Sequence, residues 1–142
     1  MLHGTYPSLC ACTNLRRATR AITQFYDSYL LPSGLQTTQY SLLSNLARVE
    51  SVSITQFAET LGMDRTTLTR NLDPLLRREL VERTHGEDQR VRMVRITPQG
   101  QELLSAARPL WTQAQERIVT RFGEERYYAL LDELSAVEEV VR

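Results

Sequence analysis

Two short amphipathic segments joined by a glycine-containing turn constrain the fold of this chain most strongly. The first segment starts at Ser53, a favoured helix N-cap residue with Gln56 three positions later, the capping-box arrangement. Gly62-Met63 then forms a tight turn, and Asp64 is placed to cap a second helix. Their apolar positions recur at the helical period: Ile54, Phe57, Ala58, Leu61, Leu68, Leu72 and Leu75 or Leu76. The pattern therefore predicts a helix-turn-helix.

The periodicity changes from helical to alternating at Leu80. Residues 81–83 are expected to form a short strand, residues 84–89 a polar turn and residues 90–96 a second strand. Thr97 followed by Pro98 is the favoured order for the N-cap and the first residue of a helix. We therefore expect a β-hairpin, or wing, that leads directly into the next helix.

Long amphipathic segments flank this region on both sides. Residues 8–31 carry one apolar stripe, a shorter helix begins at about residue 38, and two more helices follow the hairpin, separated by Gly123. A single chain would expose the stripes of the terminal helices. We therefore expect a mostly α (α+β) fold, with a winged helix-turn-helix over 36–97 and homodimerisation through helices in 8–31 and 98–142.

Composition excludes several classes of protein. The hydrophobic fraction of 42% is enough to build a core without metal or disulfides. No apolar run approaches the ~20 residues that span a membrane, and no signal-peptide core is present, so we expect a cytoplasmic protein without a membrane partner. The sequence has no P-loop, glycine-rich nucleotide fingerprint or nucleophile elbow. We therefore expect neither an enzyme nor a cofactor.

The outward side of the second short helix carries residues that suit duplex DNA. These residues are Arg65, Thr66, Thr67, Thr69 and Arg70. Arginine can bind guanine or phosphate, and threonine can contact phosphate or the thymine methyl group. The helix N-terminus adds N–H groups that favour a phosphate. The alternative is an ordinary solvated face, because helix-turn-helix motifs also occur in proteins that bind no DNA.

The predicted hairpin strengthens the DNA-binding interpretation. Arg90 lies near its tip, and Arg92 and Arg95 follow on the next strand, so an arginine can enter the adjacent minor groove. Asp88 is placed to pair with Arg90 and hold the wing, whereas the role of Arg83 is ambiguous. The net charge is zero, so any basic face must be balanced by acidic residues elsewhere. A winged-helix module that binds proteins and not DNA is the competing interpretation.

The chain resembles the MarR family of winged-helix repressors over nearly its whole length. The stretches that carry the resemblance are SITQFAETLGMDRTTLTRNLDPLLRRELVERT, EDQRVRMVRITPQG and GLQTTQYSLLSNL, and Asp88-x-Arg90 followed by Ile96-Thr97-Pro98-x-Gly100 is the most specific part. The resemblance implies a triangular homodimer with intertwined first and last helices. It also implies recognition helices in successive major grooves, wings in flanking minor grooves, a pseudo-palindromic operator and release by an inducer.

The region from residue 12 to residue 40 is also similar to the peroxide-sensing OhrR-type branch of that family. Cys12 falls on the reactive cysteine of the branch and Tyr26 on one tyrosine partner, whereas Arg16 and Thr37 occupy the other two tyrosine positions. Arg16 could lower the pKa of Cys12, which would oxidise to a sulfenic acid with Cys10 or a small thiol as resolver. The alternative is that Cys12 is a small buried core residue.

A small hydrophobic or phenolic ligand is the other candidate signal. It would bind between the dimerisation helices and the winged region, where Arg16, Arg20, Tyr26 and Tyr40 could line a cleft. A metal signal is not expected, because Cys10 and Cys12 supply only two thiolates per chain, fewer than a structural zinc site needs.

Overall fold

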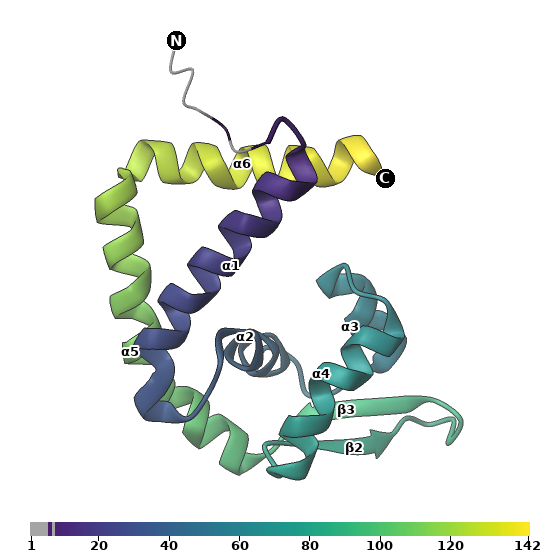
Figure 1. Cartoon of the computed structure of the whole chain (residues 1–142). Coiled ribbons are helices and arrows are strands. Elements are labelled where there is room, and N and C mark those ends of the chain that lie inside the picture. Colours follow the sequence, from purple (N-terminus) through teal and green to yellow (C-terminus); the bar gives the residue numbers. More distant parts are fainter. Residues whose placement is uncertain (1–5, 7) are drawn as a thin grey trace.

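The computed structural model describes residue 6 and residues 8–142 as a mostly helical molecule with one small sheet. The elements in order are α1 (Ala11–Leu30), the 3-10 turn η1 (Leu31–Ser33), α2 (Thr37–Leu46), β1 (Val52–Ser53), α3 (Ile54–Leu61), α4 (Arg65–Arg77), β2 (Val81–His85), β3 (Arg92–Ile96), α5 (Pro98–Phe122) and α6 (Glu124–Val141). In Figure 1, α2, α3, α4 and the sheet form one unit, framed by α1, α5 and α6. The predicted winged helix-turn-helix fold is confirmed.

The helix-turn-helix begins and turns at the predicted residues. The Ser53 hydroxyl accepts a 3.1 Å hydrogen bond from the Gln56 backbone N–H at the start of α3. Gly62 ends α3 in the left-handed region at φ 66°, which only glycine adopts without strain. Asp64 caps α4 by accepting a 2.8 Å bond from the Thr67 backbone N–H. Both helices bury their apolar faces in the common core, chiefly through Phe57, Ala58, Leu68, Leu72 and Leu75.

The sheet has three antiparallel strands in the order β1-β3-β2, so β3 lies in the middle. The two-residue strand β1 was not expected from the sequence. The expected turn over 84–89 also begins too early, because Thr84 and His85 pair with Met93 and Arg92 and extend β2. The second strand begins at Arg92 and not at residue 90.

Thr97 joins the winged unit to α5. Its hydroxyl accepts from the Gly100 backbone N–H at 3.0 Å, as an N-cap does, and donates to the Glu79 carbonyl at 2.7 Å. Its own N–H donates to the Leu80 carbonyl at 3.0 Å. Gly100 is buried against the same carbonyl, where no Cβ would fit. The predicted cap at Thr97 is confirmed, and it ties the α4–β2 turn to the start of α5.

The terminal helices leave apolar side chains uncovered in the single chain. The expected helix over 8–31 is shorter, because Cys10 is the N-cap of α1 and Leu31 already belongs to η1. α1 packs along α5, and α6 leaves the end of α5 at Gly123 (Figure 1). No residue of α6 is buried, and Leu130, Leu131, Leu134 and Val137 are 37–40% exposed. Within the described residues, no helix is long and apolar enough to cross a membrane.

Candidate nucleic-acid interface

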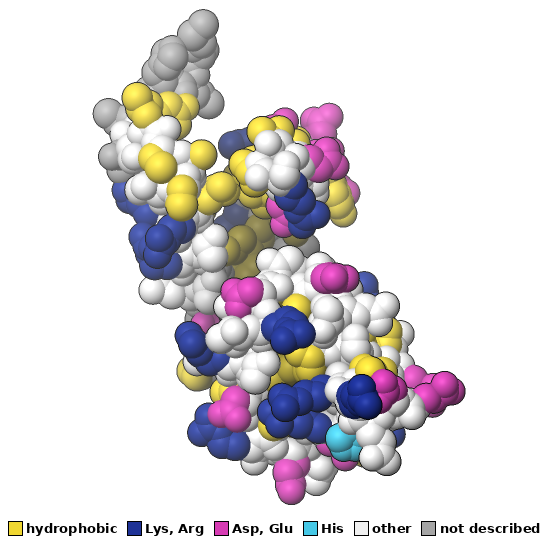
Figure 2. Space-filling model, turned by 90° about the vertical axis from the view of Figure 1, so that its right-hand side faces the viewer, with side chains coloured by type: hydrophobic (Ala, Val, Ile, Leu, Met, Phe, Trp, Pro, Cys, Tyr) yellow, Lys and Arg dark blue, Asp and Glu magenta, His cyan; other side chains and the backbone are white. Residues whose placement is uncertain are grey.

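An arginine-lined groove of about 950 Å³ runs between α4 and the wing. Its basic lining comes from both elements: Arg65, Arg70, Arg83, Arg90 and Arg92. Thr66 and Thr69 of α4 lie beside these side chains, and Leu72 and Val94 form part of the apolar floor. Figure 2 faces this side of the molecule and shows dark-blue side chains gathered around a hollow with apolar atoms at its base. Four residues predicted on α4 and Arg90 of the wing thus share one concave surface.

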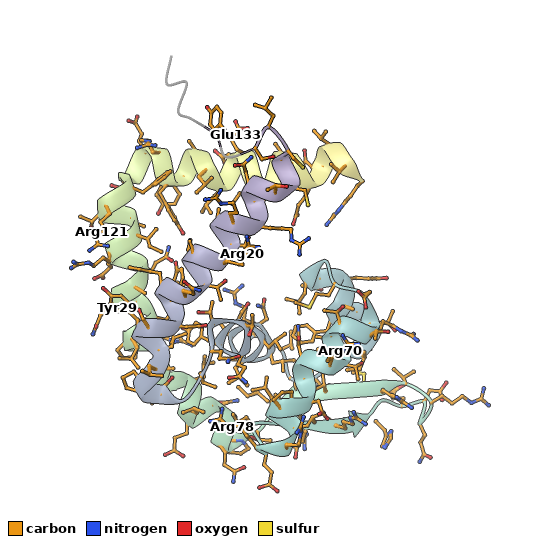
Figure 3. The ribbon with its side chains drawn as sticks, in the orientation of Figure 1. Arg20, Tyr29, Arg70, Arg78, Arg121 and Glu133 are labelled. Atoms are coloured by element: carbon orange, nitrogen blue, oxygen red, sulfur yellow. The ribbon has the colours of Figure 1, made fainter. Side chains whose placement is uncertain are left out.

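The N-terminal half of α4 positions the predicted contact residues. Arg65, Thr66, Thr69 and Arg70 are all exposed, because the opposite face of α4 is occupied by Leu68 and the other core leucines. Arg65 makes a long 3.5 Å hydrogen bond from Nη1 to the Thr55 hydroxyl, which directs it toward α3. Figure 3 labels Arg70 on α4, whose side chain lies on the side away from the core. These four residues present donors and methyl groups to the groove.

Thr67 differs from its neighbours on α4. Its hydroxyl donates a 2.8 Å hydrogen bond to Oδ2 of Asp64, while its N–H binds Oδ1 of the same carboxylate. These bonds stabilise the ionised cap and hold the pKa of Asp64 below its usual value. Thr67 does not line the groove. Because its hydroxyl is bound to Asp64, any contact that Thr67 made with DNA would come from its methyl group.

Asp88 holds the wing through the backbone. Its Oδ1 accepts a 3.0 Å bond from the Arg90 N–H, and its carbonyl accepts a 2.9 Å bond from the Val91 N–H. This is an Asx-type turn. The sequence suggested a pairing of Asp88 with Arg90, and the structure makes that contact to the main chain of Arg90. The Arg90 guanidinium forms no ion pair with any described residue, so its charge remains available.

The arginines of β3 lie on opposite faces of the sheet. Arg95 binds Glu82, its cross-strand partner on β2, with 2.6 Å between Nε and Oε1. Arg92 lines the groove instead, as does Arg83. From the sequence alone, Arg92 and Arg95 were equal candidates for a contact with DNA, and the role of Arg83 was ambiguous. The alternation of side chains along a strand separates Arg92 from Arg95, but the face toward α4 follows only from the pairing.

The groove is basic although the whole chain is neutral. One carboxylate, Asp73, lines it, and that group forms an ion pair with Arg77. Acidic residues instead accumulate on α6, among them Glu133, which Figure 3 labels at the opposite end of the molecule. The zero net charge of the chain is therefore compatible with a basic groove between α4 and the wing, because the other carboxylates lie elsewhere, many of them on α6.

Both cysteines are exposed in the single chain, so Cys12 does not belong to the hydrophobic core of one chain. Cys10 is the N-cap of α1, and the backbone N–H and hydroxyl of Thr13 lower the pKa of its thiol. This effect on Cys10 comes from Thr13, three residues further along the chain. Among the described residues, no three His, Cys, Asp or Glu side chains are arranged to hold a metal ion.

The two tyrosines predicted for a ligand cleft pack around Trp111 of α5. Tyr40 is buried, with its ring centroid 5.7 Å from that of Trp111 and the two planes 13° apart. Tyr26 lies 6.5 Å from Trp111, also stacked, and its hydroxyl donates to Gln115. Gln115 in turn donates to the Tyr127 hydroxyl at 2.7 Å. Burial, together with Tyr127, raises the pKa of Tyr26 to about 12.

Within one chain, Tyr26 and Tyr40 lie far from the thiols of Cys10 and Cys12. Tyr26 follows Cys12 by about four helical turns, or roughly 21 Å along α1. Arg16 and Arg20 are exposed on the same helix, and Figure 3 shows Arg20 on α1 at a distance from the winged unit. The structure therefore joins Tyr26 and Tyr40 through Trp111 and leaves Cys10, Cys12, Arg16 and Arg20 on the surface of α1.

Comparisons with known proteins agree with this geometry. The family model described as "MarR family" matches residues 33–90. The crystal structure of the M. tuberculosis transcriptional regulator MosR in complex with DNA is 36% identical, with a TM-score of 0.82 and coverage of 94% of this chain and 98% of that chain. The transcriptional repressor CouR bound to a 23-mer DNA duplex is 27% identical, with a TM-score of 0.80 and coverage of 91% and 92%. The uncharacterized HTH-type transcriptional regulator YwoH of Bacillus subtilis (strain 168) is 23% identical over 111 residues, which are 78% of this chain and 81% of YwoH.

Proposed function

The chain belongs to the MarR family of DNA-binding transcription regulators, and we propose that it acts as a homodimeric repressor on a pseudo-palindromic operator. The relatives are transcription regulators and not enzymes. The observation that carries the proposal is the groove in which α4 and the wing direct arginines into one concave surface. Its basic and hydrogen-bonding lining suits DNA better than a protein partner.

The helix α4 would enter the major groove. Arg65 and Arg70 are suited to guanine O6 and N7, and Thr66 and Thr69 to phosphate or the thymine methyl group. Thr67 would add a methyl contact near the N-terminus of α4, because its N–H and its hydroxyl are both bound by the Asp64 carboxylate. These assignments use only residues that are exposed on the side of α4 away from the core.

The wing would enter the minor groove with Arg90 at its tip. An arginine in this position is attracted by the negative potential of a narrow minor groove. The Asx turn at Asp88 fixes the backbone that carries Arg90, so less conformational entropy is lost on binding. Asp88 would therefore act by positioning Arg90 and not by touching DNA.

The homodimer would form through α1 and α6. Their exposed leucine, isoleucine and valine side chains form a surface that a second copy can bury. Two copies related by a two-fold axis would present two α4 helices to half-sites about one helical turn, ~34 Å, apart. The MosR match covers 94% of this chain and therefore includes most of the terminal helices, which supports a shared architecture.

A small hydrophobic or phenolic ligand would release the DNA. The stack of Tyr26, Trp111 and Tyr40 joins α1 and α5 to α2 of the winged unit. An aromatic ligand that inserted beside Trp111 would disturb this connection and change the spacing of the two α4 helices. The repressor role is supported by CouR, which is described as a transcriptional repressor.

Thiol oxidation is the second candidate signal, favoured by the exposure of Cys10 and Cys12 and the lowered pKa of Cys10. A thiolate would attack the terminal oxygen of an organic peroxide, forming a sulfenic acid and releasing an alcohol. The other thiol would then attack the sulfenic sulfur, forming a disulfide and releasing water.

The experiment is a fluorescence-anisotropy titration of a selected duplex at low salt, with the mass of the complex measured by light scattering. Arg70→Ala should weaken binding, and Arg121→Ala, which removes the same charge from the far end of α5, should not. Wild-type complexes should contain two chains per duplex. Equal weakening by both substitutions would contradict the proposed reading face, and a single chain per duplex would contradict the homodimer.

A further inference from the structure

We propose that Arg83 and Arg92 bind phosphate oxygens of the DNA strand that separates the major groove from the minor groove. They would form a phosphate-binding row distinct from the base-reading residues of α4 and from Arg90 at the wing tip. The inference rests on the proposed function and extends it to residues on the face of the β-sheet.

The strand register places both arginines on one face of the wing. Arg83 pairs with Val94, and Arg92 is two residues from Val94 on β3. Residues two apart share a face, so Arg83 and Arg92 lie on the same face as the buried Val94 and Ile96. The base of this face packs on the core, and its outer part opens into the groove.

The position of Arg83 and Arg92 between α4 and the wing tip determines which part of the DNA they contact. With α4 in a major groove and Arg90 in the adjacent minor groove, the intervening surface must face the sugar-phosphate backbone between the two. Base edges are not accessible from there. Arg83 and Arg92 line this intervening surface, and a guanidinium binds a phosphate through two parallel hydrogen bonds.

Both charges are available for a phosphate. Neither guanidinium forms an ion pair with any described carboxylate, and both side chains are exposed. Arg95 provides the contrast on the same strand, because it lies on the other face and is held by Glu82. The structure therefore offers a matched control that removes one arginine from β3 without touching the phosphate-binding row.

The test compares Arg83→Ala, Arg92→Ala and Arg95→Ala by anisotropy titrations from 50 to 200 mM salt. The duplexes are the selected site and a scrambled sequence. Each lost phosphate contact lowers the salt slope by about 0.9, so a dimer that lacks two should have a slope shallower by about 1.8. Over this fourfold range the wild-type protein should lose about 12-fold more affinity than Arg83→Ala or Arg92→Ala. Arg95→Ala should match the wild type.

Two further readouts separate phosphate binding from other roles. The ratio of affinities for selected and scrambled duplexes should stay unchanged in Arg83→Ala and Arg92→Ala, because phosphates carry no sequence. Arg92→Lys should restore most of the slope, since it retains the charge. Thermal unfolding of each variant confirms that the fold is intact.

The outcomes distinguish this inference from the proposed function. Wild-type binding with unchanged slopes in Arg83→Ala and Arg92→Ala would overturn the phosphate-binding row alone. A fallen specificity ratio in those variants would also overturn it, because the residues would then read bases. A wild-type protein that bound neither duplex would overturn both proposals.

Discussion

Substitution of Gly100 by alanine should destabilise the junction between the wing and α5. An ideal Cβ at this position would lie 2.0 Å from the Leu80 carbonyl oxygen, 2.7 Å from Cγ1 of Ile96 and 3.0 Å from the Leu80 carbonyl carbon. The Leu80 carbonyl cannot withdraw freely, because it accepts a hydrogen bond from the Thr97 N–H at 3.0 Å. The methyl group must therefore displace main chain on one side or the other.

The magnitude of the Gly100→Ala effect follows from three opposing terms. Overpacking costs about 1–3 kcal/mol, and loss of the bond between Thr97 and Leu80 costs about 1 kcal/mol more. The higher helix propensity of alanine offsets this loss of stability by up to about 1 kcal/mol. The net loss in the free energy of unfolding should be about 1–4 kcal/mol, and each kcal/mol lowers the melting temperature by roughly 4 °C for a chain of this size.

Thermal and urea unfolding, monitored by circular dichroism at one protein concentration, measure the Gly100→Ala effect. Gly86→Ala in the wing turn is the matched control, since its added Cβ would meet Met93 and Val91 only at ordinary distances of 3.7–3.8 Å. The control should change stability by no more than about 0.5 kcal/mol. Equal stability of the two variants would refute the close packing of α5 on the α4–β2 turn.

Three further predictions concern the reading face, the dimer and the thiols. Arg90→Ala should weaken DNA binding, measured by anisotropy, about tenfold or more. The melting temperature, measured by calorimetry, and the dimer should stay unchanged, because Arg90 is exposed. An unfolded variant would instead mean that Arg90 belongs to the core. Leu134→Glu on the exposed face of α6 should yield monomers by light scattering, whereas Leu134→Met should remain dimeric. Dimers in both variants would show that this face of α6 is not part of the dimer interface. In a Cys12→Ser variant, the alkylation rate of Cys10 should inflect at a pH below that of an ordinary cysteine, because the lowered pKa populates the thiolate at lower pH. Thr13→Val removes the hydroxyl but keeps the backbone N–H, which is the larger contribution, so it should move that inflection upward only in part; an unchanged inflection would contradict the role of the Thr13 hydroxyl.

The helix-turn-helix could be predicted from the sequence because its signals are local. Ser53, Gly62 and Asp64 each act on neighbouring residues, and the leucines of α4 repeat at the helical period. β1 could not be predicted, because a two-residue strand has no periodicity and exists only through its pairing with Val94 and Met93 on β3.

The candidate site was predictable in its residue types but less so in its geometry. Four of the five predicted α4 residues meet Arg90 in one groove, as their exposure and position suggested: Arg65, Thr66, Thr69 and Arg70. The engagement of the Thr67 hydroxyl by Asp64 depends on cap geometry. Strand alternation places Arg92 and Arg95 on opposite faces, but which of the two faces the groove depends on the sheet face that α4 covers, and this is decided by contacts distant in sequence.

The tyrosines show where resemblance and geometry diverge. Tyr26 matches a peroxide-sensing position by alignment, yet its hydroxyl binds Gln115 of α5 within the same chain. Tyr40 is a core residue stacked on Trp111. The pairing of α1 with α5 that creates these contacts is a tertiary property, which the residues of α1 alone do not encode.

Selection of duplexes from a random DNA pool by the purified, reduced protein tests the central claim most directly. We expect enrichment of a palindrome with half-sites about one helical turn apart, and loss of that enrichment when Arg65 and Arg70 are both replaced by alanine. Absence of any enriched sequence at low salt, or the same palindrome recovered with the doubly substituted protein, would contradict the assignment of the groove between α4 and the wing as the DNA-reading surface.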